Sequence, residues 1–142
     1  MAQNGYNTNL AAEFHVLSTL HRMGMEAMLT LGNKKTVDIV VMREGGRVVT
    51  VDVKGLAGTT GWPVDNFRGP ATDHFLAFVC YAGRIQDPAF VPEVWIVPSL
   101  HLDTLIYRAP GGRRIVQRRT LKKNADRYLN AWNILGRESV PE

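Results

Sequence analysis

Two runs of β-branched and other apolar residues, separated by a short segment with two glycines, constrain the fold of this chain most strongly. Residues 36–42 read TVDIVVM, residues 48–53 read VVTVDV, and the five residues between them read REGGR. β-Branched residues favour strands, and a glycine turn between two such runs is typical of a β-hairpin. The sequence therefore predicts two neighbouring antiparallel strands.

The length of the hairpin loop decides which side chains share a face. If residues 44–46 form a three-residue loop with a glycine in the left-handed conformation, Arg43 pairs with Arg47. In that register Asp38 stands opposite Asp52, whereas a two-residue turn puts the two acids on opposite faces. Two carboxylates about 5 Å apart repel each other unless a cation lies between them. A shared metal site at these acids therefore requires the odd-length loop or a bulge.

Four charged residues lie in stretches whose other residues predict burial. Asp38 interrupts an apolar strand, and Asp52 and Lys54 share one face at the end of the next. Glu13 lies among leucines at helical spacing. Because an unpaired buried carboxylate is costly, the acids point to a shared cation. The plainer alternatives are a glutamate that reaches water from the end of a helix, and strand-end acids that face solvent or pair with the lysine.

The remaining elements complete a mixed α/β pattern in a single domain over residues 1–142. We expect a helix over residues 8–23, strands over residues 26–31, 75–81 and 94–97, a long loop over residues 55–72, and a last helix over residues 122–135. With the hairpin, this order is α-β-β-β-loop-β-β-α. It predicts a mixed central β-sheet flanked by helices.

An acid in the first helix, an aspartate that opens one strand and an acid-x-Lys sequence that closes the next resemble the PD-(D/E)XK nuclease superfamily. That group includes restriction endonucleases and archaeal Holliday-junction resolvases. Here the pattern is carried by Glu13, Val37-Asp38 and Asp52-Val53-Lys54, within residues 8–82. Val37 stands where the name of the superfamily has proline. The resemblance implies a restriction-endonuclease-like core.

The resemblance also implies metal-dependent hydrolysis of DNA phosphodiesters, as in an endonuclease. Asp38, Asp52 and Glu13, with the Val53 carbonyl, would hold one or two Mg²⁺ or Mn²⁺ ions, which would activate water and polarise the scissile phosphate. Lys54 would position the nucleophile or offset charge on the phosphate. One alternative keeps the fold without catalysis, as a module that binds nucleic acid or a protein partner. Another is a structural α/β domain.

Basic residues concentrate in residues 107–127. The net charge of the chain is +4, and this segment contains a single acid, Asp126. Clustered positive charge suits a polyanion such as DNA, although a solvated basic surface without a ligand is the alternative. The residues expected to contact nucleic acid are Arg108, Arg113, Arg114, Arg118 and Arg119. Trp62, in the long loop, is expected either to stack on a base or to pack on the core as a lid.

The remaining features bear on location and partners. No apolar run approaches the ~20 residues of a membrane span, and the first residues lack the features of a signal peptide. With Cys80 as the single cysteine, expected to be an inert core thiol, a cytoplasmic location is the default. His74, at the start of a strand, is a candidate proton shuttle or a structural residue. We expect so small a nuclease to act as a homodimer or with a specificity-providing protein partner.

Overall fold

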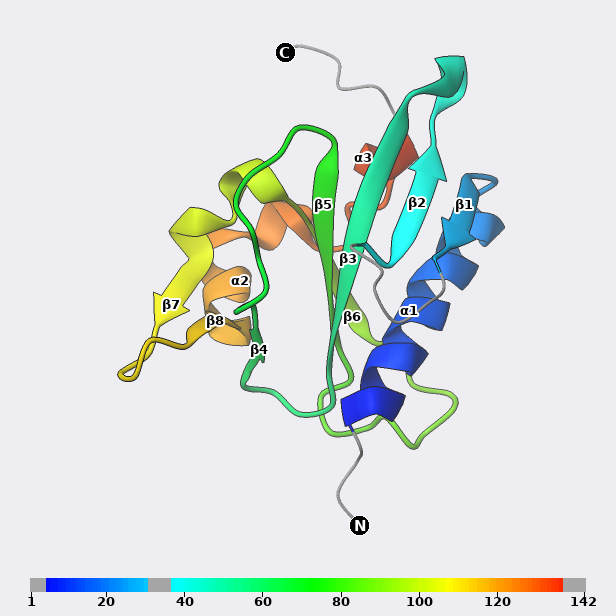
Figure 1. Ribbon diagram of the computed structural model, residues 1–142. Helices are drawn as coiled ribbons and strands as arrows, with labels where there is room; N and C mark the ends of the chain where they lie inside the picture. The colour runs from blue at the N-terminus through cyan, green and yellow to red at the C-terminus, as the bar shows by residue number, and fades with distance from the viewer. Residues whose placement is uncertain (1–4, 31–36, 137–142) are drawn as a thin grey trace.

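A five-stranded mixed sheet forms the centre of the molecule (Figure 1). The computed structural model describes residues 5–30 and 37–136. The sheet has the order β1-β2-β3-β5-β6, in which β3 and β5 are parallel and the other neighbours antiparallel. The strands are β1 (Glu26–Leu29), β2 (Ile39–Met42), β3 (Val48–Leu56), β5 (His74–Cys80) and β6 (Glu93–Pro98). The expected α/β class is confirmed. Among the described residues no helix combines the length and apolar character needed to cross a membrane.

The β2–β3 hairpin has the odd-length loop on which the predicted register depends. The two glycines of residues 44–46 have φ values of 86° and 84°, and the Arg43 N–H donates to the Arg47 carbonyl at 2.7 Å. Only glycine adopts such positive φ values at little cost. The loop sets Ile39 opposite Val51. The three-residue loop is therefore confirmed, with its register.

Helix α1 (Gly5–Arg22) covers one face of the sheet, together with the short helix α3 (Asn133–Gly136). The odd-numbered residues of β3 point to this face, where Val49, Val51 and Val53 join a core with Ala12, Val16 and Leu20. Phe14, on the other side of the helix, is 51% exposed. It lies about 200° around the helix from Ala12, so it points away from the sheet.

Strand β3 approaches the first turns of α1 closely at Gly55. A Cβ atom at this position would lie 2.8 Å from the Thr8 carbonyl oxygen and 3.1 Å from the Ala12 Cβ. The Gly55 N–H also donates to Asn9 Oδ1 at 3.1 Å. The absence of a side chain at Gly55 thus sets how closely the helix lies against the end of β3.

A small second sheet and helix α2 (Arg118–Asn124) cover part of the opposite face. This sheet has the order β4-β8-β7 and comprises β4 (Gly61–Pro63), β7 (Ile106–Arg108) and β8 (Arg114–Gln117). Its core contains Trp62, Phe78, Cys80 and Trp95. Cys80 is buried as expected, and burial raises the pKa of its thiol. The loop expected over residues 55–72 therefore contains a strand, β4.

Trp62 belongs to this second core. Its side chain is 1% exposed, its Nε1–H donates to the Val79 carbonyl at 3.1 Å, and its ring lies 5.1 Å from that of Phe78. A ring closed in this way has no face to offer to a base. The expectation that Trp62 stacks on nucleic acid is wrong, and the alternative of packing on the core is correct.

The prediction of a single helix over residues 122–135 is also wrong. Helix α2 ends at Asn124, a 3₁₀ turn follows at Asp126–Tyr128, and α3 is a separate helix. Between them Leu129 forms a β-bridge with Trp95, and the Asn130 N–H donates to the Val94 carbonyl at 2.8 Å. Bonds to β6 replace helical bonds here because this segment covers the edge of the sheet.

Replacing Gly55 by alanine is expected to lower the free energy of unfolding by about 1–3 kcal/mol, because the α1 backbone must move to admit a methyl group. Gly58→Ala is the control, since nothing lies within 4 Å of a Cβ there. Urea unfolding followed by tryptophan fluorescence measures both. Equal stability of the two variants would contradict the close approach as the reason for glycine at this position.

Candidate functional site

Asp38 and Asp52 lie on one face of the β2–β3 hairpin. The strand pairing begins with Ile39 opposite Val51, and the N–H of the preceding residue also donates to the Val51 carbonyl, at 3.1 Å. Asp38 and Asp52 are the residues next to this pair in the chain. Both residues line a cleft of about 670 Å³, named here the carboxylate cleft. It lies on the face of β3 away from α1, because Asp52 alternates with valines that pack against that helix. The geometric condition for a shared cation, one face for both acids, is met.

The Asp38 carboxylate is tied to the backbone of β3. The Val53 N–H donates to Asp38 Oδ2 at 2.7 Å. This bond satisfies an N–H group of β3 just beyond its pairing with β2, which explains an aspartate at the entry of an apolar strand. A carboxylate has about four acceptor positions, so the bond is compatible with a bound cation.

His74 lies beside Asp52 in the carboxylate cleft. Its Nε2 is 3.4 Å from Asp52 Oδ2, and its Nδ1 is 2.7 Å from Thr50 Oγ1. Thr50 and His74 are direct partners in the parallel pairing of β3 with β5. The histidine can therefore orient the carboxylate. Thr50 was not predicted from the sequence, although its two-residue spacing from Asp52 places it on the same strand face.

Lys54 continues the polar row of β3 toward its end. Its Nζ donates to Asn66 Oδ1 at 2.8 Å. Asn66 and Arg68 belong to residues 66–72, which form the opposite wall of the carboxylate cleft. Sequence reasoning missed these two residues because polar residues in a loop have no periodicity that would reveal a shared site.

Glu13 is placed differently from the strand acids. It is 8% exposed, on the helix that covers the other face of β3, and it is not among the residues that line the carboxylate cleft. Within residues 5–30 and 37–136, no three or more His, Cys, Asp or Glu side chains form a group that could hold a metal ion. The structure brings together two of the three predicted acids, and a role for Glu13 in a metal site stays a prediction.

Two of the arginines expected to contact nucleic acid are bound within the protein. Arg118 Nε donates to Glu93 Oε1 at 2.8 Å, and this bond raises the pKa of the guanidinium group. Arg114 Nη2 donates to the carbonyl oxygens of Asp65, at 2.6 Å, and Phe67, at 2.9 Å. Because these guanidinium groups hold the second sheet in place, the prediction that they contact phosphate is corrected.

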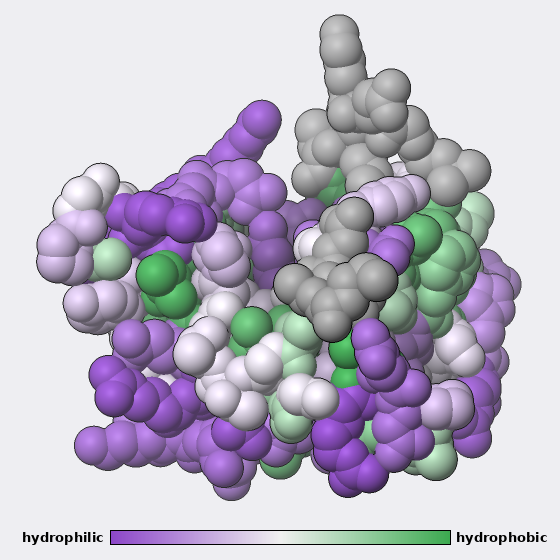
Figure 2. Space-filling model, turned by 90° about the horizontal axis from the view of Figure 1, so that it is seen from below, coloured by the Kyte–Doolittle hydropathy of each residue, from purple (hydrophilic) through white to green (hydrophobic). Residues whose placement is uncertain are grey.

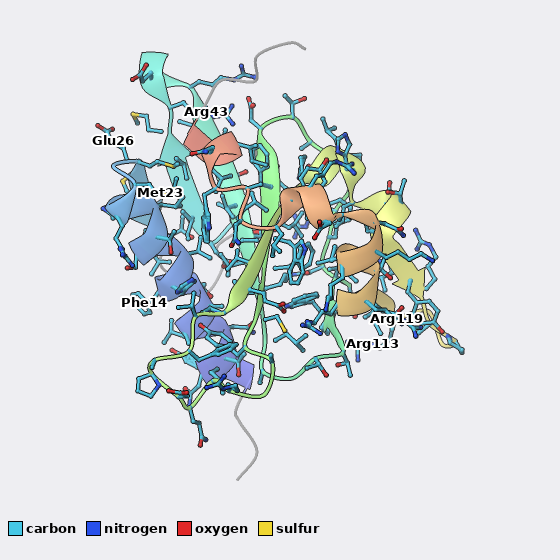
Figure 3. All side chains as sticks on the ribbon, turned by 180° about the vertical axis from the view of Figure 1, so that it is seen from behind. Phe14, Met23, Glu26, Arg43, Arg113 and Arg119 are labelled. Carbon is cyan, nitrogen blue, oxygen red and sulfur yellow. The ribbon has the colours of Figure 1, made fainter. Side chains whose placement is uncertain are left out.

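Besides Arg127, whose guanidinium group lies over the Tyr128 ring, this region has five exposed basic residues. They are Arg108, Arg113, Arg119, Lys122 and Lys123, named here the basic surface. Arg113 and Arg119 lie at the end of the molecule formed by β7, β8 and α2 (Figure 3). Arg113 makes an exposed ion pair of 3.1 Å with Asp65, and such a pair contributes little to stability. These side chains are accessible to a polyanion.

Comparison with solved structures finds this fold in a nuclease. A structure described as that of a bacterial homing endonuclease, I-Ssp6803I, matches with a TM-score of 0.55 and 18% sequence identity, over 94% of this chain and 93% of that one. At this identity the likeness establishes a nuclease-like fold and no more. No protein-family model and no curated protein matches the sequence.

Asp38→Ala is expected to lower the free energy of unfolding by about 1–3 kcal/mol, because the Val53 N–H loses its acceptor. Asp38→Asn keeps an oxygen for that bond, so its stability should stay closer to wild type. Urea unfolding compares the two variants. Equal losses would show that the carboxylate is not held by this bond.

Proposed function

We propose that this chain is a metal-dependent DNA endonuclease of the PD-(D/E)XK type. The observation that carries the proposal is the carboxylate cleft, which Asp38, Asp52 and Lys54 line together. Two carboxylates and an ammonium group stand at the strand positions of the superfamily motif. The fold likeness to a protein described as a homing endonuclease supports DNA as the substrate.

The donors of the cleft suit Mg²⁺ or Mn²⁺. Mg²⁺ takes oxygen ligands and is usually bound through one or two carboxylates while it keeps several waters. Asp38 and Asp52 would supply these carboxylates, while the Val53 carbonyl and Glu13, which do not line the cleft, stay predicted further ligands. The ion would supply a water activated at neutral pH and polarisation of the scissile phosphate.

The side chains of the cleft would orient the reacting groups. Lys54 Nζ, held by Asn66, can donate to an oxygen of the scissile phosphate and offset the negative charge that develops there. The hydrogen bond from the Val53 N–H fixes the orientation of the Asp38 carboxylate before substrate binds. The contact with His74 likewise fixes the orientation of the Asp52 carboxylate. Groups fixed in this way need little reorganisation during the reaction.

The basic surface would bind the DNA backbone. Phosphate contacts supply affinity and salt dependence, while sequence is read by other contacts. The carboxylate cleft is the site of one chain, so cleavage of both strands of a duplex would require a second copy or a protein partner. A homodimer is therefore part of the proposal.

One observation favours a second candidate, a nuclease-fold module that binds nucleic acid or a protein without catalysis. Within the described part of the chain the acids do not form a group of three metal ligands. That module would bind DNA without metal and would be insensitive to loss of Asp52 or Lys54. Cleavage assays separate the two candidates.

Purified protein is expected to nick supercoiled plasmid DNA in Mg²⁺ or Mn²⁺. Asp52→Asn and Lys54→Met should each lower the rate by about 10²–10³-fold, the loss typical of one group that stabilises transition-state charge. Asp87→Asn is the control, because this exposed acid pairs with Arg84 outside the cleft. Nicking at the wild-type rate by either cleft variant would refute the proposal, as would a wild-type protein that is inactive with both metals.

The double variant Arg119→Gln, Lys122→Gln should bind DNA more weakly, and its slope of log K against log salt should fall by about 1 for each phosphate that the protein no longer neutralises. The control is the double variant Arg22→Gln, Arg84→Gln, which removes the same charge from exposed arginines outside the basic surface. Fluorescence anisotropy over a range of NaCl concentrations measures the slopes. Identical slopes for both double variants would exclude the basic surface from DNA binding.

A further inference from the structure

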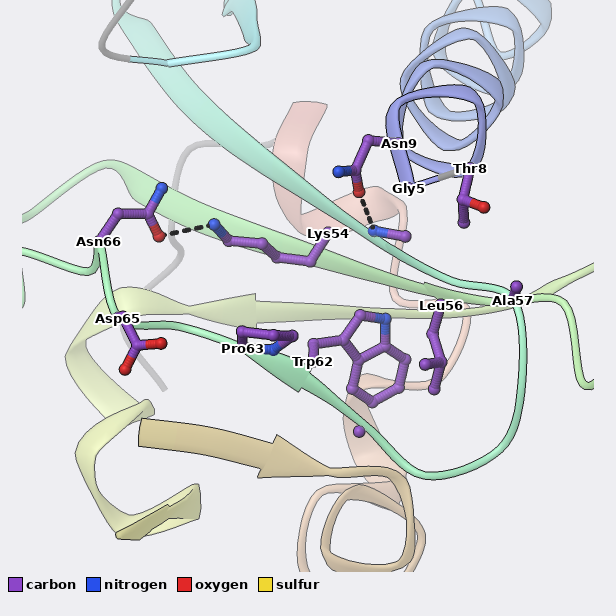
Figure 4. A pocket seen from close by; sticks show the side chains of 12 residues that line it. Gly5, Thr8, Asn9, Lys54, Leu56, Ala57, Trp62, Pro63, Asp65 and Asn66 are labelled. Carbon is purple, nitrogen blue, oxygen red and sulfur yellow. Dashed lines mark hydrogen bonds between the residues drawn. The ribbon is translucent and has the colours of Figure 1, made fainter. Parts of the chain in front are cut away.

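A second cleft adjoins the carboxylate cleft and continues it along β3. It has a volume of about 520 Å³ and is lined by the start of α1, the end of β3, and β4 with the residues that follow it (Figure 4). Lys54 and Asn66 line both clefts, and the 2.8 Å hydrogen bond between them lies where the clefts meet. We name this second space the amide cleft, after Asn9 and Asn66.

The two asparagines present donors to the amide cleft. Asn9 Oδ1 accepts the Gly55 N–H at 3.1 Å, and Asn66 Oδ1 accepts from Lys54 Nζ at 2.8 Å. Each amide thus uses its acceptor oxygen within the protein, which leaves its NH₂ group for a ligand. In Figure 4 the Asn9 and Asn66 amides lie on either side of the Lys54 side chain.

Asp65, the one acid among the described residues that line the amide cleft, already accepts hydrogen bonds from two arginines. Asp65 Oδ1 accepts the Arg114 N–H at 2.8 Å, and its Oδ2 accepts from Arg113 Nε at 3.1 Å. These bonds, that of the Arg114 backbone first, lower the pKa of the Asp65 carboxyl group. Besides the buried Thr8, the polar side chains that line the cleft therefore offer a ligand an ammonium group and two amide NH₂ groups. Donors of this kind select an anion rich in acceptors, such as a phosphodiester.

The rest of the lining suits the sugar and base that accompany a phosphate. It includes Leu56, Ala57, Trp62 and Pro63, together with three glycines: Gly5, Gly55 and Gly61. Seen from below, pale and green residues gather in the lower middle of the surface, between hydrophilic residues on either side (Figure 2). A space with apolar walls and a few convergent polar groups is the usual form of a ligand site.

We propose that the amide cleft is a subsite for the DNA strand on one side of the scissile phosphate; this rests on the proposed function. From Thr50 to Leu56 the floor of the two clefts extends over about 20 Å, at roughly 3.3 Å per residue. Stacked nucleotides repeat every ~3.4 Å, so several fit along it. A strand that occupies both clefts passes over Lys54 without ending there. The enzyme therefore acts on internal phosphodiesters, and DNA ends are not required.

Asn9→Asp tests the subsite with little change in shape. The aspartate keeps an oxygen for the Gly55 N–H but replaces the NH₂ donor by a negative charge. Asn7→Asp is the matched control, because it makes the same charge change on an exposed residue of the same helix turn that does not line the cleft. Asn66→Asp makes the same change on the opposite wall and keeps the acceptor for Lys54.

Binding is measured by fluorescence anisotropy with a fluorescein-labelled 30-base-pair duplex in EDTA, so that no cleavage occurs. Asn9→Asp and Asn66→Asp should each raise Kd at least about tenfold above that of Asn7→Asp, as expected for loss of a hydrogen bond to a charged group. Thermal unfolding followed by circular dichroism shows which variants are folded, and either folded cleft variant suffices for the comparison.

The outcomes separate the two proposals. If wild-type protein binds and cleaves DNA but both cleft variants bind like Asn7→Asp, the subsite is refuted and the proposed function stands. If wild-type protein neither binds nor cleaves DNA, the proposed function itself fails. Relaxed circular plasmid, which has no ends, should be cut as fast as the same plasmid made linear. If only the linear form is digested, the proposal that the DNA strand continues past Lys54 through both clefts is refuted.

Discussion

The hydrogen bond from the Arg43 N–H to the Arg47 carbonyl, which closes the hairpin loop, sets the position of every candidate site residue on β3. A slip of one residue would turn Asp52 and Lys54 toward α1 and would turn the core valines into the cleft. Because glycine adopts positive φ values without steric strain, the three-residue loop forms at a low cost in free energy. The loop residues themselves therefore specify the register. The hydrophobic core and the carboxylate cleft are two consequences of this one pairing.

Strand β3 connects the site to the rest of the molecule. It is bonded to the start of α1 through Asn9, to the entry of β2 through Asp38, to β5 through His74 and to the loop after β4 through Asn66. Its row of polar side chains also changes in character along the strand. Asp52, with Asp38 beside the strand, comes first and suits a cation; Lys54 follows, and the amides of Asn9 and Asn66 next to it suit a phosphate.

The failures of sequence reasoning share one cause, which is contact with segments distant in the chain. Trp62 follows a glycine-rich loop and looked available to a base, but it packs on Phe78 in the second core. Residues 122–135 have helical periodicity, yet bonds to β6 from Leu129 and Asn130 interrupt the helix. Arg118 belongs to a basic run, and its partner Glu93 is 25 residues away. Periodicity and local charge contain no information about such partners.

The sequence by itself determined the α/β order and the hairpin, because strand alternation and glycine turns act over a few residues. It left two loop lengths open, and the structure decided for the one that puts Asp38 and Asp52 on one face. The tertiary structure decided which side of the sheet is open. It placed α1, with Glu13, over one face of β3 and placed His74 and Asn66 around the other. It also decided which arginines are exposed, because packing brings acceptors to the guanidinium groups of Arg114 and Arg118. The neighbours of β3 come from distant parts of the chain, so only packing could make one site of them.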